Sequence, residues 1–114
     1  MKWLWIAFAA VMLFAADMYA DNISQAKSYM REAEYYIRQA ESYRRDADYY
    51  LRQAESYSKE VTYYTRQEKI DTAKSYQRKA DDAMDKYKQN IRKAEDAEGK
   101  AADYLRRAAR QLDN

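Results

Sequence analysis

Apolar side chains recur every seven residues from Ile23 to Tyr64. Tyrosines hold one heptad position without a gap, and alanines hold another at the same interval. The larger apolar residues at a third position are Ile23, Met30, Ile37 and Leu51. Naming this third position a places the alanines at d and the tyrosines at g. A repeat of seven predicts a long amphipathic helix that packs along a narrow seam.

The heptad register is interrupted once, near the middle of the chain. Position a falls at Thr65 and next at Ile70, after which the heptad continues to the end. The segment that starts at Ile70 also repeats the opening motif that starts at Ile23. Two matched arms predict an all-α fold, a long antiparallel helical hairpin that forms an alanine-rich two-helix coiled coil. Because the break contains neither Gly nor Pro, one continuous long helix in a multi-chain coiled coil stays open as the alternative.

The hairpin prediction sets boundaries within a single helical domain of residues 21–114. Arm one is expected at about 22–65, the turn at about 66–71 and arm two at about 72–112. The predicted seam consists of Ile23, Ala26, Met30, Ala33, Ile37, Ala40, Ala47, Leu51, Ala54, Ile70, Ala73, Ala80, Met84, Ile91, Ala94, Ala101, Leu105, Ala108 and Leu112. Arg44 and Glu98 interrupt the a series. We expect them to set register and partner number, as polar a residues do.

Residues 1–20 differ in composition from the rest of the chain. Lys2 precedes an unbroken apolar stretch from Trp3 to Ala16, which is shorter than the roughly 20 residues of a membrane span. This order is typical of a secretory signal peptide, with cleavage expected after Ala20. The alternative is a retained hydrophobic segment, in which case residues 3–16 would be the part that contacts a membrane. We expect a secreted, periplasmic or cell-surface protein.

The composition limits the chemistry that the chain can perform. Its 114 residues include no cysteine and no histidine, and only one glycine. Thiolate chemistry, histidine-based catalysis and glycine-rich nucleotide loops are therefore excluded. With 21 basic and 19 acidic residues, the balance of charge does not favour nucleic acid as a partner. The sequence predicts no enzyme, no cofactor and no metal site.

A row of basic residues occupies position c of arm two. Its members are Lys79, Lys86, Lys93, Lys100 and Arg107. Acidic residues lie three or four positions away on the same helix, which is typical of a solvated helix face. Contact with an anionic polymer or a membrane surface is the less favoured interpretation of this row.

The tyrosines of arm one form two sets. Those at g are expected to cover the alanine seam with their ring faces. At position f, Tyr35, Tyr49 and Tyr63 alternate with serines and are expected to point away from the seam. Each precedes a g tyrosine, so that doublets recur every 14 residues, about 21 Å along a helix. The predicted self-association residues are Tyr35, Tyr36, Tyr49, Tyr50, Tyr63 and Tyr64.

These patterns favour an exported, non-enzymatic structural protein. It is expected to self-associate through its seams and its periodic tyrosine face into homo-oligomers or filaments. The alternative is an envelope-surface adhesin or a periplasmic binding module for an extracellular protein or a polysaccharide. The layout, a signal peptide followed by a cysteine-free helical hairpin, resembles that of small secreted coiled-coil adhesins and periplasmic coiled-coil proteins.

Overall fold

The chain folds into two long helices joined by a short turn. A computed structural model describes residues 20–113, in which α2 spans Ala20–Arg66 and α3 spans Ile70–Asp113. The predicted all-α helical hairpin is confirmed, since α2 ends at Arg66 rather than continuing into α3. The turn lies at 67–69, between the two helices. The predicted signal peptide falls, except for Ala20, outside the described residues.

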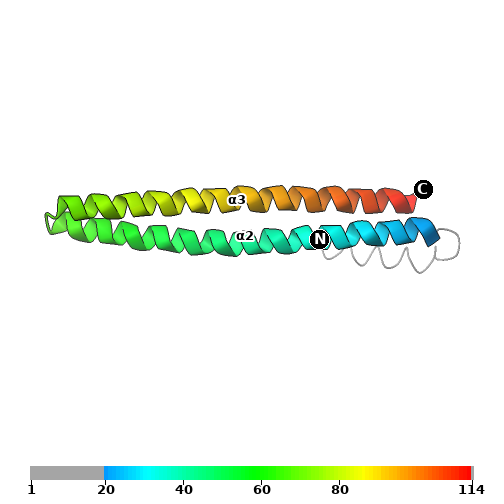
Figure 1. Ribbon diagram of the computed structural model, residues 1–114, viewed down its shortest axis with the longest axis horizontal. Coiled ribbons are helices and arrows are strands. Elements are labelled where there is room, and N and C mark those ends of the chain that lie inside the picture. Colours follow the sequence, from blue (N-terminus) through cyan, green and yellow to red (C-terminus); the bar gives the residue numbers. More distant parts are fainter. Residues whose placement is uncertain (1–19, 114) are drawn as a thin grey trace. The chain divides into compact units, whose positions relative to one another are not determined.

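The hairpin divides into two compact units. The turn unit is Gln39–Asp96, and the terminal unit combines the described part of α2 up to Arg38 with the part of α3 from Ala97 onward. Within each unit a segment of α2 lies beside an antiparallel segment of α3 (Figure 1). The terminal unit has a small core in which Ala26 and Met30 of α2 pack with Ala108 of α3. Each unit is therefore held together by contacts between the two helices.

Helix α2 ends in a Schellman motif, although the turn contains no glycine. The Lys69 amide donates a hydrogen bond of 2.9 Å to the carbonyl of Tyr64, and the Glu68 amide donates one of 3.1 Å to that of Thr65. These two bonds satisfy carbonyl groups that the helix end leaves without partners. Glu68 takes the left-handed conformation, with φ of 61°, where glycine is usually found. The reversal of the chain therefore requires a non-glycine residue in the left-handed conformation, which is strained.

Glu68→Gly is expected to stabilise the hairpin. Glycine adopts positive φ without the steric strain that a side chain brings, and the gain exceeds its larger loss of backbone entropy. We expect the free energy of unfolding to rise by about 0.5–1 kcal/mol, measured by chemical denaturation. Glu68→Ala is the control, because it removes the charge and keeps the strain. A Glu68→Gly variant no more stable than Glu68→Ala would contradict this account of the turn.

The core of the hairpin consists almost wholly of alanine. The buried residues are Ile23, Ala26, Met30, Ala33, Ala40, Ala47, Ala54, Ala73, Ala80, Ala83, Ala94, Ala97, Ala101 and Ala108. No polar or charged side chain is buried within residues 20–113. A methyl group is the only side chain that alanine offers, so the two helices can approach closely. The seam is therefore narrow, and it tolerates little increase in side-chain volume.

Apart from Ile23 and Met30, which are buried, the larger a residues stand at the margin of this seam rather than in it. Those that are half-buried are Ile37, Leu51, Met84, Ile91, Leu105 and Leu112. Ile70, the first residue of α3, is 50% exposed. The two polar a residues, Arg44 and Glu98, are exposed, and both take part in interactions of their own. Their effect on register and partner number stays a prediction.

Candidate association surface

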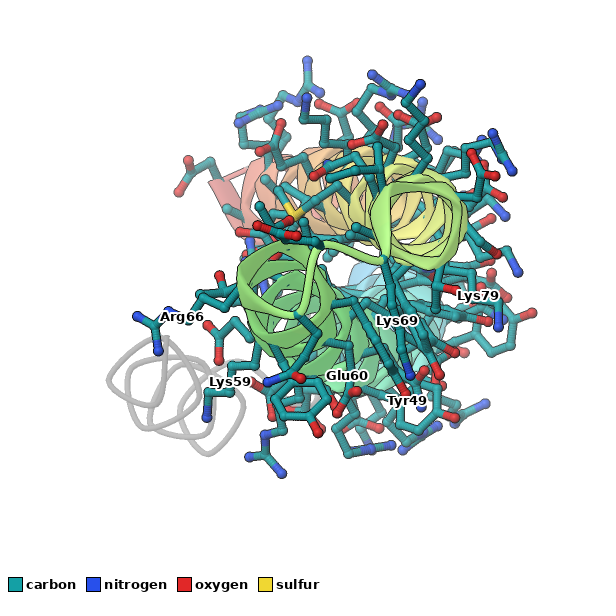
Figure 2. All side chains as sticks on the ribbon, turned by 90° about the vertical axis from the view of Figure 1, so that its left-hand side faces the viewer. Tyr49, Lys59, Glu60, Arg66, Lys69 and Lys79 are labelled. Carbon is teal, nitrogen blue, oxygen red and sulfur yellow. The ribbon has the colours of Figure 1, made fainter. Side chains whose placement is uncertain are left out.

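Three tyrosine rings project from α2 into solvent. Tyr35, Tyr49 and Tyr63 are 49%, 57% and 54% exposed. Viewed from the turn, Tyr49 projects from the side of α2 that faces away from α3 (Figure 2). Its hydroxyl accepts a hydrogen bond of 3.0 Å from the amide nitrogen of Gln53, one turn further on. The outer rings therefore present an ordered aromatic surface that the fold of the hairpin leaves exposed.

Each exposed ring meets the next tyrosine of α2 edge to face. The ring centroids of Tyr35 and Tyr36 are 5.1 Å apart, and the angle between the ring planes is 74°. The doublet at 49–50 has a centroid distance of 5.3 Å and an interplanar angle of 73°. The doublet at 63–64 has a centroid distance of 5.0 Å and an interplanar angle of 81°. The inner ring of each doublet is half-buried. The structure therefore brings together the predicted residues as three pairs of closely similar geometry.

An acidic residue accompanies each exposed ring. Glu32, Asp46 and Glu60 lie three residues before the three outer tyrosines, a spacing that places side chains on the same helix face. The serines that alternate with these tyrosines have glutamine at this place instead, at Gln39 and Gln53. Viewed from the turn, Glu60 projects on the same side of α2 as Tyr49 (Figure 2). The outer surface thus repeats a ring with a carboxylate three residues before it and basic residues four positions before and three positions after it.

Two tyrosines of α3 insert between tyrosine rings of α2. In the turn unit, Tyr76 stacks on Tyr64 with 5.4 Å between the ring centroids and 8° between the ring planes, and its centroid is 6.1 Å from that of Tyr57. In the terminal unit, Tyr104 stacks on Tyr36 with 5.8 Å between the ring centroids and 9° between the ring planes, and its centroid is 6.1 Å from that of Tyr29. The same three-ring arrangement therefore forms twice, and each instance joins the two helices.

One tyrosine in these stacks has a perturbed pKa. The pKa of Tyr64 is raised above its usual value of 10.0, first because a phenolate there would face the stacked Tyr76 phenol. Desolvation adds to the rise, and so does the negative charge of Glu60. All three effects disfavour the phenolate, so Tyr64 remains a neutral ring at physiological pH.

The basic row of arm two lies over the g tyrosines of arm one. The ammonium of Lys79 is 6.0 Å from the Tyr57 ring centroid, and that of Lys86 is 5.4 Å from Tyr50. The next two pairs are Lys93 with Tyr43 at 5.7 Å and Lys100 with Tyr36 at 5.4 Å. Each step of seven residues forward in α2 is matched by seven residues backward in α3. These distances are those of cation–π contacts, which hold the two helices in register.

Basic residues also cover two tyrosines of α3 itself, Tyr76 and Tyr104. Lys79 lies 4.8 Å from the ring centroid of Tyr76, and the guanidinium of Arg107 lies 5.0 Å from that of Tyr104. In both cases the basic residue follows the tyrosine by three positions. The row that sequence reasoning assigned to a solvated face or an anionic partner therefore contacts rings of its own chain.

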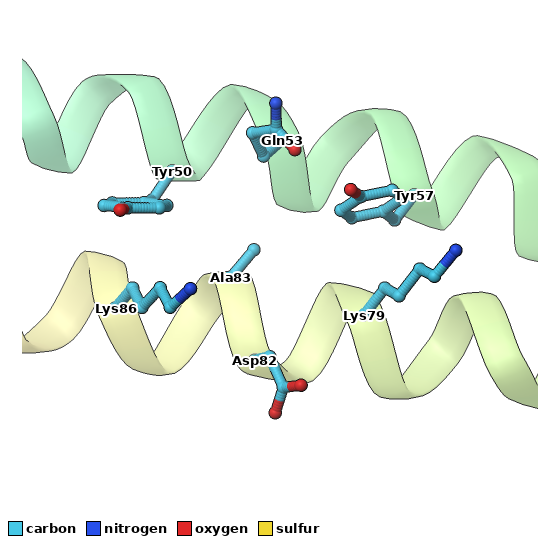
Figure 3. Close-up of a pocket in the computed structure, with 7 residues that line it drawn as sticks. All are labelled: Tyr50, Gln53, Tyr57, Lys79, Asp82, Ala83 and Lys86. Atoms are coloured by element: carbon cyan, nitrogen blue, oxygen red, sulfur yellow. The ribbon is translucent and has the colours of Figure 1, made fainter.

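A groove opens at Ala83, which occupies the same heptad position of α3 as Tyr76 but one heptad later. It has a volume of about 200 Å³ and is lined by Tyr50, Gln53, Tyr57, Lys79, Asp82, Ala83 and Lys86. Both tyrosine rings lie in the space between the helices, the two lysines extend beside them and Ala83 points towards α2 (Figure 3). The carboxylate of Asp82 points away from α2 (Figure 3). The groove is therefore aromatic on its α2 side and basic on its α3 side.

Sequence reasoning missed the buried alanines at position g of α3. Ala83 and Ala97 are 6% and 5% exposed, although neither belongs to the predicted a and d seam. The signal was present, since position g of α3 reads Tyr, Ala, Asn, Ala, Tyr and Gln from residue 76 to residue 111. The small residue at Ala83 leaves space beside the tyrosines of α2.

No match to a known protein assigns a function to this surface. No protein-family model matches the chain, and neither curated proteins nor solved structures show a significant similarity to it. Within residues 20–113, no cluster of acidic side chains is arranged to hold a metal ion. Nor does any helix in that range have the length and apolar character needed to cross a membrane. The tyrosine surface and the groove are the features from which a function can be argued.

Proposed function

We propose that the protein is an exported, non-enzymatic structural protein that self-associates into oligomers or filaments. The observation that carries the proposal is the row of exposed tyrosines at 35, 49 and 63, each in the same edge-to-face geometry. Aromatic rings are enriched among the residues that contribute most to protein interfaces. A repeated row of them on one helix offers several equivalent contacts to a neighbouring molecule.

Burial of these rings would not be needed for the hairpin to fold. The contacts that join α2 to α3 are made by the inner tyrosines, the basic row and the alanine seam. The outer rings pair with the neighbouring tyrosines of α2, and the Tyr49 hydroxyl accepts a hydrogen bond from Gln53 of the same helix. Association through them therefore adds to the fold rather than replacing part of it.

The proposal is tested by changing Tyr35, Tyr49 and Tyr63 together to serine. Serine alternates with these tyrosines at the same heptad position, so each change copies a residue that α2 already carries there. We expect the mass measured by light scattering after size exclusion to fall from an oligomer towards a monomer at micromolar concentration. Helical circular dichroism should stay the same, because the seam is untouched.

The full chain and residues 21–114 are measured side by side, so that association through the N-terminal apolar stretch is distinguished from association through the tyrosines. Changing Ser28, Ser42 and Ser56 to alanine is the matched control at the alternate f positions, and it should leave the mass unchanged. A clean monomer of the unaltered residues 21–114 would contradict the proposal. A fixed small species that binds a protein or glycan would favour the binding module instead.

A further inference from the structure

The groove at Ala83 is an aromatic site that lacks its central ring. At Tyr76 and Tyr104, a ring of α3 is flanked by two rings of α2 and covered by the basic residue three positions later. At Ala83 the flanking rings of α2 are Tyr50 and Tyr57, and the basic residue three positions later is Lys86. All parts of the site are present except the ring itself.

We propose that an exposed tyrosine of a second copy of this chain fills the groove at Ala83. The inference rests on the proposed self-association and names the surface that receives the outer rings. A tyrosine ring is the side chain that the equivalent place accepts at Tyr76, where it stacks at 5.4 Å. Offset or tilted ring pairs at such distances are favourable beyond the area that they bury.

The outer tyrosines are the exposed rings that the described part of a second copy offers as the occupant. The groove brings two ammonium groups, Lys79 and Lys86, beside the vacant ring position, against the single carboxylate of Asp82 that points away from α2. Each outer ring has a carboxylate three residues before it, Asp46 for Tyr49 and Glu60 for Tyr63, and basic residues four positions before and three positions after it. Of these neighbours, the carboxylate is the group that complements the two lysines of the groove.

The spacing of the outer tyrosines along α2 equals the spacing of two buried alanines along α3. The outer tyrosines recur every 14 residues, and Ala97 follows Ala83 by 14 residues, again with a lysine three positions later. The projecting ring and the receiving groove are different patches of one chain. Contacts between unlike patches can repeat from molecule to molecule, which generates rings or filaments.

The first test is Ala83→Tyr in the full chain, which places the missing ring within the same molecule. We expect the dissociation constant for self-association to rise by about tenfold or more, as the loss of two ring contacts implies. Ala109→Tyr is the matched control, because Ala109 is exposed and lies outside the groove. It should leave the dissociation constant unchanged, and circular dichroism should show that both variants remain helical.

A second measurement decides the matter if Ala83→Tyr fails to fold. A variant with Lys79→Glu and Lys86→Glu has an acidic groove, and a variant with Asp46→Lys and Glu60→Lys has basic outer rings. Each alone should associate more weakly than the unaltered chain, and an equimolar mixture should recover association. A mixture that associates no better than its components would overturn the inference.

The outcomes separate this inference from the proposed function. If the serine variant at 35, 49 and 63 loses association while Ala83→Tyr keeps it, the outer tyrosines dock on a surface other than the groove and this inference fails alone. If neither change affects association, the proposed tyrosine-mediated assembly fails as well. Loss of association in both variants supports both.

Discussion

Ala33→Leu is expected to lower the free energy of unfolding by about 2–3 kcal/mol. Ala33 is fully buried, with 0% of its surface exposed, and Ala101, at d in the α3 segment of the same unit, is equally buried. The extra methylene and methyl groups of leucine have no space between the helices. Either the helices separate or the leucine takes a strained rotamer, and both cost free energy.

Separation of the helices would have a second consequence in the same unit. The Tyr36 and Tyr104 rings are stacked with 5.8 Å between their centroids, and Lys100 lies 5.4 Å from the Tyr36 centroid. Ring and cation contacts weaken when these distances grow. The penalty therefore includes contacts that leucine does not itself touch.

Ala109→Leu provides the matched comparison, because it makes the same chemical change at an exposed position of α3. It should stay within about 0.5 kcal/mol of the unaltered protein. Both variants are measured by chemical denaturation at one protein concentration, since association shifts apparent stability. If Ala33→Leu unfolds at the same denaturant midpoint as Ala109→Leu, the seam is looser than the structure indicates.

The hairpin could be predicted from sequence because two patterns each carried a strong signal. The repeat of seven identified the face of each helix that packs, since a helix turns by a fixed angle at each residue. The jump in register between Thr65 and Ile70 located the reversal. The turn itself carries no sequence signal of its own, because Glu68 occupies the left-handed position where glycine is expected.

The contacts between the helices could not be predicted in the same way. A heptad shows which residues share a face of one helix, but not which residue of the other helix lies at the same level. That level is fixed by the number of residues in the turn, which decides that Lys86 rather than another lysine meets Tyr50. The basic row was therefore interpreted only as a solvated face; its residues are exposed, but four of its lysines also lie over tyrosine rings of α2.

The groove at Ala83 was missed for a related reason. Its existence depends on three residues from two helices, namely Ala83 and the two rings at Tyr50 and Tyr57. Once the register is known, the sequence of position g in α3 becomes informative. Tyrosine there completes a stack, and alanine there leaves one open.

Tyr104→Ala is expected to lower the free energy of unfolding by about 2–3 kcal/mol. The change removes two ring pairs, with Tyr36 and Tyr29, and each such pair contributes about 0.5–1.5 kcal/mol beyond buried area. It also removes the ring under Arg107 and exposes apolar surface of the half-buried site. Chemical denaturation followed by circular dichroism gives the value.

Tyr49→Ala is the control that separates the two kinds of tyrosine. It also removes a ring from a ring pair, but its partner Tyr50 belongs to the same helix and its ring is mostly exposed. Its cost should stay below about 1 kcal/mol. Tyr104→Phe keeps the stack and should also cost less than about 1 kcal/mol. Equal losses in the free energy of unfolding for Tyr104→Ala and Tyr49→Ala would mean that the stacks between the helices do not stabilise the hairpin. A large loss for the first alone would establish that inner tyrosines hold the fold and leave the outer ones available for association.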